Sequence, residues 1–471
     1  MASSHLTTRT SRLPSPVLAG PLRLVPFVLL ALTVVIGAVA GSSPQLGILL
    51  ALGVLFLVVV TQDLALGVCG FLLLTFLDVL SSNSDLSLTK LGGAALAAAW
   101  LAALATQGGT RRELVAGAPW LAALLIAFLA WSGLSALWAE SPGAAFSSTI
   151  RFGLNAMLVP IVYFAVRNQR HVVWIFGVFV VGTLLSVAWG LFDERTVGGA
   201  TAAQTGRLVG ARVEANVLAT LLVVAVVFAG ALALVLRRRP LGRALSLGAA
   251  VIGLVALLAT FSRGGLVAMA AVLVVGVFYA GRWRPAVVAF TLVAVVIGAI
   301  YVGSASSGAA ERLTSGGTSG RTDIWTVGWR MVEANPLVGV GSGNYRAAAP
   351  GYLLYPGTIR RDDFIIDVPY AAHNIYLHVL AEMGVVGLAL FLAVMGLCIG
   401  AANRAVALFR RDGRRSLELM GRALVVAILG TLVADFFVSE QYNKQLWILL
   451  AMGPALLAIA RGAPGHAAER A

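Results

Sequence analysis

The sequence predicts an all-α protein: a polytopic bundle of transmembrane helices with one large extracytoplasmic loop that contains short amphipathic helices. Its composition, the spacing of its apolar runs and the placement of its arginines support this fold class. Of 471 residues, 59% are hydrophobic and 11% are charged, whereas a soluble globular domain has about 25% charged residues. The composition therefore excludes a soluble globular protein.

Apolar runs follow one another along most of the chain. A bilayer core of about 30 Å requires about 20 apolar residues per helix. The chain offers fourteen such runs, some of them short, near residues 24–40, 45–61, 64–80, 88–105, 115–138, 148–166, 171–192, 215–236, 244–260, 264–280, 285–302, 374–400, 421–438 and 445–460. Because only Gln62 and Asp63 separate the second run from the third, a count of twelve spans is the alternative.

The basic residues fall on alternate connections between these runs. The clusters are Arg111 and Arg112, Arg167 and Arg170, Arg237 to Arg239, Arg282 and Arg284, and Arg410 to Arg415. Cytoplasmic loops of membrane proteins carry an excess of Lys and Arg. We therefore expect a multi-pass protein of the cytoplasmic membrane with both termini in the cytoplasm, and we attribute the net charge of +14 to topology and not to a nucleic-acid partner.

Five segments follow from this topology. They are a disordered cytoplasmic N-terminus at 1–20, an N-terminal transmembrane bundle at 21–302, an extracytoplasmic loop at 303–372, C-terminal transmembrane helices at 373–460 and a cytoplasmic tail at 461–471. Cys69 and Cys398 lie within apolar runs, so we expect packed thiols with neither a disulfide nor a metal cluster.

Arginines stand at the outer membrane edge in two connections. Arg207 and Arg212 lead into the run that contains Asn216, and Ser262-Arg263 joins two apolar runs with almost no loop. Ionised groups at this depth are rare and tend to be functional, although an arginine can also anchor a helix at the interface. Guanidinium groups make forked, charge-assisted hydrogen bonds to phosphate. The arginines therefore favour an anionic substrate at the outer face.

The outer loop contains the pattern of a short helix. In GRTDIWTVGWRMVEANP, Thr322 or Asp323 can cap the helix and Pro336 ends it, with apolar residues at helical spacing between them. We expect an amphipathic helix on the outer membrane surface. Arg321 stands at its start, which topology places near Arg263.

Three glycines, Gly339, Gly341 and Gly343, follow that helix. The strand and helix of a nucleotide-binding fold do not surround them, so their spacing is a weak signal of nucleotide binding. They predict a tight loop whose backbone can approach a ligand closely.

His373 opens the apolar run that follows the loop. A histidine at a helix start is often structural, but this one lies close by topology to Arg263 and Arg321. A neutral imidazole can accept a proton near neutral pH, which makes His373 a candidate general base. His378 and Glu382 lie further along the same run, and we expect them to support the site.

The histidine pattern resembles a signature of the O-antigen ligase and O-antigen polymerase superfamily, which are polytopic membrane glycosyltransferases. His373-Asn374, then nine residues, Gly384, two residues and Gly387 is similar to the signature that follows the large periplasmic loop of that family.

The arginine segments also resemble this superfamily. Ser262-Arg263-Gly264 is similar to its membrane-edge arginine motif, and the segment that Arg321 leads is similar to its loop pattern. Arg207 with Gly210 and Asn216 resembles a further recurrent segment.

The resemblance implies an enzyme of cell-surface polysaccharide assembly that uses no cofactor or metal. Such an enzyme transfers glycan from a polyprenyl-diphosphate-linked donor to a hydroxyl of a lipid or glycan acceptor at the outer face of the membrane, with inversion at the anomeric carbon. It implies that His373 is the general base and that Arg263 and Arg321, helped by Arg207 and Arg212, bind the diphosphate. The supporting residues are Ser262, Asn374, Glu382, Gly384 and Gly387.

Three alternatives remain open at this point. A polymerase that extends lipid-linked repeat units shares these motifs, and fourteen runs exceed the twelve spans associated with the ligases. A transporter of lipid-linked sugars would show paired halves with helices interrupted at mid-membrane, and the sequence contains no such repeat. A structural subunit of an envelope-synthesis complex would tolerate the loss of His373.

Overall fold

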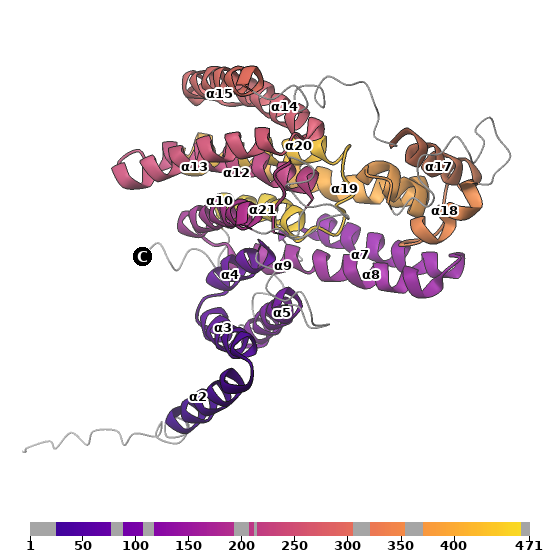
Figure 1. The fold of residues 1–471 in the computed structure, drawn as a ribbon, viewed down its shortest axis with the longest axis horizontal. Helices are drawn as coiled ribbons and strands as arrows, with labels where there is room; N and C mark the ends of the chain where they lie inside the picture. The colour runs from indigo at the N-terminus through magenta and orange to yellow at the C-terminus, as the bar shows by residue number, and fades with distance from the viewer. Residues whose placement is uncertain are drawn as a thin grey trace, which may run out of the picture. The chain divides into compact units, whose positions relative to one another are not determined.

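A computed structural model describes residues 25–76, 88–106, 117–192, 207–211, 214–304, 321–353 and 371–462. In these ranges the ordered elements are helices, with no β-strand (Figure 1). They are α2 (Val25–Ser42), α3 (Pro44–Gln62), α4 (Leu64–Phe76), α5 (Leu88–Thr106), α7 (Pro119–Leu134), η2 (Ser135–Leu137), α8 (Pro142–Ala156), α9 (Leu158–Ala165), α10 (Gln169–Phe192), α12 (Ala215–Val235), α13 (Pro240–Ala259), α14 (Arg263–Tyr279), η3 (Gly281–Trp283), α15 (Arg284–Ser304), α17 (Arg321–Ala334), α18 (Tyr345–Leu353), α19 (Ile375–Arg411), α20 (Arg415–Ala434) and α21 (Lys444–Arg461).

The expectation of an all-helical membrane protein is confirmed. Within the described ranges, nine helices are long and apolar enough to cross a membrane. Each of the fourteen apolar runs overlaps a described helix, but several of these helices are shorter than 18 residues, so the count of fourteen spans stays a prediction. The predicted segments 1–20 and most of 461–471 lie outside the described residues, as do parts of the predicted outer loop.

The chain divides into two units, residues 1–58 and residues 59–471. In the first unit, α2 and α3 follow one another with Ser43 between them. The backbone N–H of Ser43 donates to the carbonyl of Val39 at 2.7 Å, and that of Gly47 donates to the carbonyl of Ser43 at 3.0 Å. The remainder of the fold belongs to the second unit.

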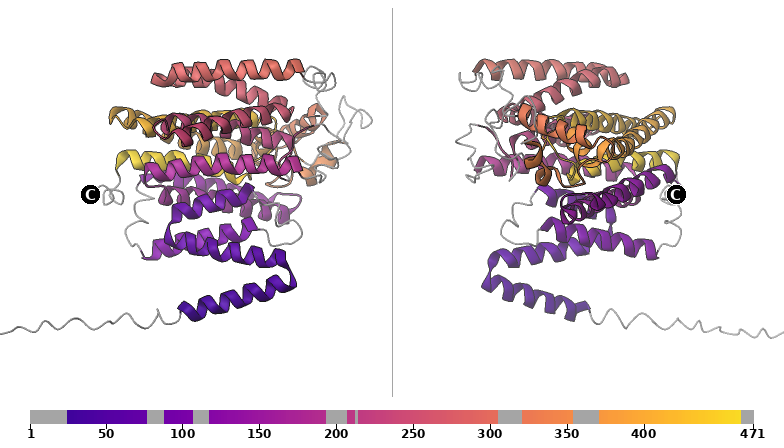
Figure 2. Two further views of the ribbon diagram at one scale, coloured as in Figure 1. Left: turned by 60° about the vertical axis from the view of Figure 1, so that its left-hand side comes forward. Right: turned by 90° about the vertical axis from the view of Figure 1, so that its right-hand side faces the viewer.

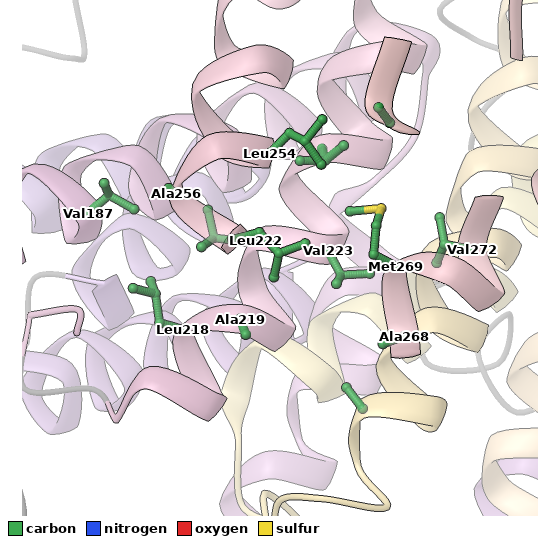
Figure 3. Packing of buried hydrophobic residues seen from close by; sticks show 14 of the residues in the cluster. Val187, Leu218, Ala219, Leu222, Val223, Leu254, Ala256, Ala268, Met269 and Val272 are labelled. Carbon is green, nitrogen blue, oxygen red and sulfur yellow. The ribbon is translucent and has the colours of Figure 1, made fainter. Parts of the chain in front are cut away.

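In the second unit, α12 is a central helix. Its Leu218, Leu222 and Val226 are buried in an apolar cluster with Leu254 of α13 and Met269 of α14 (Figure 3). Lipid chains are as apolar as these side chains, so close packing and not hydrophobic transfer stabilises such contacts inside a membrane. The packing fixes the α13–α14 hairpin, which carries Arg263, against α12.

A glycine permits the closest approach between α14 and α12. A Cβ atom added at Gly265 would lie 2.5 Å from the Cβ of Ala219, so a larger residue would push the two helices apart. Small residues at helix contacts in membranes serve this purpose. The start of α14 is therefore held close to the start of α12.

The helix α19 is broken at Gly384, which has φ of 65° and ψ of −172°. The break leaves carbonyl groups without helical partners, and the segment that follows α17 supplies donors for them. The N–H of Val340 donates to the carbonyl of Ala381 at 2.9 Å, and the N–H of Gly341 donates to that of Glu382 at 2.8 Å. The loop after α17 thus docks into the broken helix.

Gly384 is required at this break for two reasons. Its conformation is nearly exclusive to glycine, and an added Cβ would lie 2.1 Å from the carbonyl oxygen of Leu337. The N–H of Val385 donates to the carbonyl of Pro336 at 2.9 Å, which holds the loop on the other side of the break. Gly387 of the same signature lies where a Cβ would meet Met383 at 2.2 Å.

The three loop glycines pack against protein atoms, contrary to the expectation of a ligand-facing loop. All three have positive φ. An added Cβ at Gly339 would lie 2.4 Å from the backbone of Glu382, one at Gly341 would lie 2.5 Å from Ala139, and one at Gly343 would lie 2.8 Å from the carbonyl of Ala144. The sequence revealed the tight turns but not that α19, α8 and the turn before α8 fill the space beside them.

The predicted amphipathic helix is α17, which begins at Arg321 and ends before Asn335. Its Ile324, Val327 and Met331 are buried in a cluster shared with α18 and α19. Protein packing, and not a membrane surface, therefore covers much of its apolar face.

Candidate functional site

Separate stretches of the chain meet at one end of the second unit. They are the segment that enters α12, the α13–α14 turn, the start of α17, residues 371–374 before α19, and residues 435–443 between α20 and α21 (Figure 1). The helices α12, α14, α17, α19 and α21 all begin here. The N-terminus of a helix carries the positive end of its dipole and favours anions. We call this the site end.

Arg207 stabilises the α13–α14 turn. Its Nε donates to the carbonyl of Thr260 at 2.8 Å, and its Nη2 donates to Oδ1 of Asn216 at 3.0 Å. The hydroxyl of Ser262 donates to the same Asn216 oxygen at 2.9 Å. The sequence predicted that Arg207 helps to bind an anion. In the structure its side chain joins the turn that precedes Arg263 to the start of α12. Arg212 lies outside the described residues.

Ser262 places Arg263 at the first position of α14. The Ser262 hydroxyl caps this helix by accepting a hydrogen bond from the N–H of Gly265 at 3.2 Å. The preceding residue, Phe261, has a positive φ of 48°, which a side chain with a Cβ adopts only at a cost of about 1–3 kcal/mol. The turn is therefore both strained and fixed by hydrogen bonds.

Arg321 lies close to Arg263. Burial lowers the pKa of the Arg321 guanidinium, the positive charge of Arg263 lowers it further, and the negative charge of Glu214 opposes both effects. Two cations at short range repel one another, so a polyanion between them would be stabilised by both.

Phe437, from the α20–α21 connection, separates the two arginine elements. The guanidinium of Arg321 lies 5.8 Å from the centre of the Phe437 ring, a cation–π distance. A Cβ added at Gly264 would lie 2.7 Å from the Phe437 side chain. The glycine beside Arg263 therefore makes room for the ring on which Arg321 rests.

His373 has a positive φ of 47°. Among the described residues, His373 and Phe261 are the two non-glycine residues with positive φ. Phe261 lies two residues before Arg263, and His373 is itself the candidate base. Neighbouring contacts hold this conformation: the indole N–H of Trp325 donates to the carbonyl of Ala372 at 2.9 Å, and the N–H of Asn374 donates to the hydroxyl of Ser439 at 3.1 Å. Such strain persists where the surrounding structure fixes it, and it is common at functional sites.

Asn374 begins α19 as its cap. Its Oδ1 accepts hydrogen bonds from the N–H groups of Tyr376 at 2.9 Å and Leu377 at 3.0 Å. The N–H of Ile375 donates to the carbonyl of Asp435 at 2.9 Å. Asn374 therefore fixes the backbone that follows His373 at the start of α19.

The electrostatic surroundings of His373 favour its neutral form. Burial lowers the pKa of His373, as do the charges of Arg321 and His378, whereas Glu214 raises it. A histidine whose pKa lies below its ordinary value is neutral at pH 7 and can accept a proton.

Glu214 faces both His373 and Arg321, and the sequence reasoning missed it. The sequence signal that could have identified Glu214 is its position: it is an acidic residue just before α12, in the segment that contains Arg207 and Arg212.

Two further carboxyl groups border the site end. Asp435 is buried, and burial raises its pKa well above the ordinary range, with Glu440 adding to the effect. Burial also raises the pKa of Glu440 to about 7, and Glu214 contributes in the same direction. Glu440 therefore links Asp435 electrostatically to Glu214, the acid that faces Arg321 and His373.

Glu382 is fastened to the loop that docks on α19. Its two carboxylate oxygens accept hydrogen bonds from the N–H of Gly343 at 2.8 Å and of Tyr345 at 3.1 Å. Nε2 of His378 lies 3.2 Å from the same carboxylate, and Nδ1 of His378 lies 3.4 Å from the N–H of Ala372. Glu382 and His378 thus connect the loop to the residue that precedes His373.

A buried hydroxyl cluster anchors this loop to α7 and α8. Ser342 lies 2.5 Å from the hydroxyl of Ser148 and 3.0 Å from that of Ser132, and Ser148 also contacts the hydroxyl of Tyr442 at 2.6 Å. Arg151 lies over the Tyr442 ring at 5.6 Å.

Among the described residues, no group of three or more His, Cys, Asp or Glu side chains is arranged to hold a metal ion.

The comparison with protein families matches the region that builds most of this site. Residues 248–392 match the family model described as O-Antigen ligase, and this interval contains the α13–α14 turn, α17, His373 and the break in α19. A search of curated proteins finds no match. Over residues 248–392, therefore, the chain is similar to the O-antigen ligase family.

Proposed function

We propose that this protein transfers a glycan from a polyprenyl-diphosphate-linked donor to an acceptor hydroxyl. The observation that carries the proposal is the meeting of Arg263, Arg321 and His373, from three distant segments, inside the region that matches the O-antigen ligase family. Two cations beside a neutral imidazole suit a reaction in which a diphosphate leaves as a hydroxyl group attacks.

The site end faces the outside of the cytoplasmic membrane in this proposal. The helices α12 and α14 begin at the site end, and the clusters Arg237 to Arg239 and Arg282 with Arg284 follow their opposite ends. We call that opposite side the arginine-rich end. The preference of Lys and Arg for cytoplasmic loops supports the arginine-rich end as the cytoplasmic side, and we propose the cytoplasm for both termini.

Arg263 and Arg321 would bind the diphosphate and stabilise the negative charge that grows on it as the bond to the sugar breaks. Groups positioned for charge that develops in the transition state make large contributions to catalysis. Binding a diphosphate also relieves the repulsion between the two arginines, and their combined charge makes a metal ion unnecessary. Arg207 would act by positioning the turn, and Arg212 remains a proposed donor contact.

His373 would accept the proton of the acceptor hydroxyl. The oxygen of that hydroxyl attacks the anomeric carbon, the carbon–oxygen bond to the diphosphate breaks, and the diphosphate leaves on its lipid. A single displacement inverts the anomeric configuration. The imidazolium that forms lies near Glu214, whose negative charge stabilises it.

The test is reconstitution of the purified protein with a labelled polyprenyl-diphosphate oligosaccharide. A new glycosidic product supports the proposal, whereas movement of the donor across the membrane without a new bond would show a transporter. Donor supplied alone separates the two transferases: a ladder of chain lengths identifies a polymerase, and product that appears only after an acceptor is added identifies a ligase. The polymerase is the second candidate because the chain carries fourteen apolar runs, more than the twelve spans associated with the ligases.

A variant sharpens the test of the base. His373→Asn keeps a residue that tolerates positive φ but lacks the basic imidazole, so it should fold as well as the wild type. Loss of a general base lowers the rate by about 10²–10⁴-fold. Near-normal transfer by this variant would disprove the assignment of His373 as the base. If the protein were instead a structural subunit, His373→Asn would leave envelope synthesis unchanged.

A further inference from the structure

A cavity of about 440 Å³ lies between α12, α13, α14, α15 and α20. Its lining is mostly apolar and includes Gly230, Leu254, Met269, Phe290 and Val426. Several of these residues border the packed cluster of α12, α13 and α14 (Figure 3). The cavity is far larger than a packing defect, and its size and lining suit a flexible hydrocarbon chain.

The cavity occupies about half of the bundle thickness, on the arginine-rich side. On α12 its lining extends from Val226 to Leu234, and on α13 from Arg243 to Leu254, which at 1.5 Å per residue corresponds to about 12–17 Å. A bilayer core is about 30 Å thick, so the cavity spans one leaflet. It stops well short of Arg263 and does not reach the donor site.

One wall of the cavity is loosely packed. The window of apolar residues that contains α15 is 6% buried inside the protein, against 78% for α12. Both views in Figure 2 show α15 at the edge of the bundle. Lipid can therefore reach the cavity beside α15.

The mouth of the cavity is positively charged. Arg243, Arg422 and Trp283 belong to its lining. The carboxylate of Glu418 pairs with Arg422 at 3.0 Å and with Arg282, which is not part of the lining, at 3.2 Å. The exposed Arg243 adds a further positive charge. Tryptophan is enriched where a membrane protein meets lipid headgroups.

We propose that the cavity binds one acyl chain of an anionic glycerophospholipid from the leaflet on the arginine-rich side, with its phosphate beside Arg243 and Arg422. The apolar lining accepts the chain, the depth matches one leaflet, and the surplus of arginine selects the anionic headgroup. Because α14 forms one wall and begins at Arg263, a bound lipid would steady the hairpin that carries this arginine. The inference does not depend on the transfer reaction.

The experiment measures lipid binding to the delipidated, detergent-solubilised protein by native mass spectrometry. Phosphatidylglycerol, phosphatidylcholine and undecaprenyl phosphate are added separately at equal concentrations. We expect phosphatidylglycerol to be retained more than phosphatidylcholine. In Arg243→Gln its affinity should fall about fivefold, the equivalent of about 1 kcal/mol for one basic residue, with no change for phosphatidylcholine.

Two glycine variants provide a matched pair. Neither Gly230 nor Gly248 has an atom within 4 Å of an added Cβ, but only Gly230 lines the cavity. Gly230→Leu should abolish retention of phosphatidylglycerol, and Gly248→Leu should preserve it. Undecaprenyl phosphate can also bind at the proposed donor site, so its retention should be the same in the wild type and in Gly230→Leu. Equal retention of the two phospholipids, undiminished phosphatidylglycerol binding by Gly230→Leu, or a loss of undecaprenyl phosphate in that variant would each overturn the inference. If Gly230→Leu fails to fold, Arg243→Gln decides the outcome.

Discussion

Replacing Gly384 with alanine should separate the docked loop from α19. The new Cβ would lie 2.1 Å from the carbonyl oxygen of Leu337, so the loop must move. The backbone of residue 384 would also be strained, at a cost of about 1–3 kcal/mol. Three hydrogen bonds, from Val340, Gly341 and Val385, would be lost, at about 1 kcal/mol each. The local free energy of opening should therefore fall by about 4 kcal/mol or more.

Hydrogen–deuterium exchange of peptides that cover residues 336–345 measures this change. A loss of about 4 kcal/mol corresponds to exchange about a thousandfold faster at the Val340 and Gly341 amides. Gly396→Ala is the matched control, because Gly396 lies in the same helix with open space around it. There the change from glycine to alanine should stabilise the helix by about 0.5–1 kcal/mol. Unchanged protection in Gly384→Ala, or equal loss in both variants, would refute the docking argument.

The remaining predictions concern the site end. Arg263→Ala and Arg321→Ala should each lower kcat/KM for the donor about 10–100-fold, since a hydrogen bond to a charged group contributes about 1.5–3 kcal/mol; steady-state kinetics with purified donor checks this, and an unchanged value would remove that residue from the donor site. The acid limb of the kcat/KM pH profile should lie below 6.5, the ordinary pKa of histidine, because burial lowers the pKa of His373. Glu214→Gln removes the charge that raises this pKa, so the limb should move to still lower pH, and a limb that stays in place would show that Glu214 does not act on His373. Asn374→Ala should lower the melting temperature, because loss of such a helix cap costs about 1 kcal/mol; Asn374→Asp, which retains the acceptor, should restore most of it.

The sequence predicted much of the fold because a membrane helix can be recognised from the composition of its own segment. About 20 apolar residues in a row predict a span, and the predicted helix end at Pro336 agrees with the observed end of α17 at Ala334. The sequence also singled out Arg263, Arg321 and His373, because each stands at the edge of an apolar or amphipathic segment; their roles in catalysis are proposals.

What the sequence could not predict depends on contacts between distant segments. Phe437 gave no signal that it lies between Arg321 and Gly264. Nor did the pattern after α17 show that its glycines face α19 and α8 rather than a ligand. A local motif reveals that a backbone turn is tight, but the atoms that fill the space beside the turn come from elsewhere in the chain.

The short stretch of α19 before Gly384 is attached at both of its ends. Asp435 and Ser439 hold its beginning, and Val340 and Gly341 hold its final carbonyls. A helix segment of this kind moves as one body, so a change at either attachment shifts both the proposed base and the loop. Substitutions at Ser439 and Gly341 should therefore be energetically coupled although they contact opposite ends of the segment, and selection acting on one end constrains which residues the other can accept.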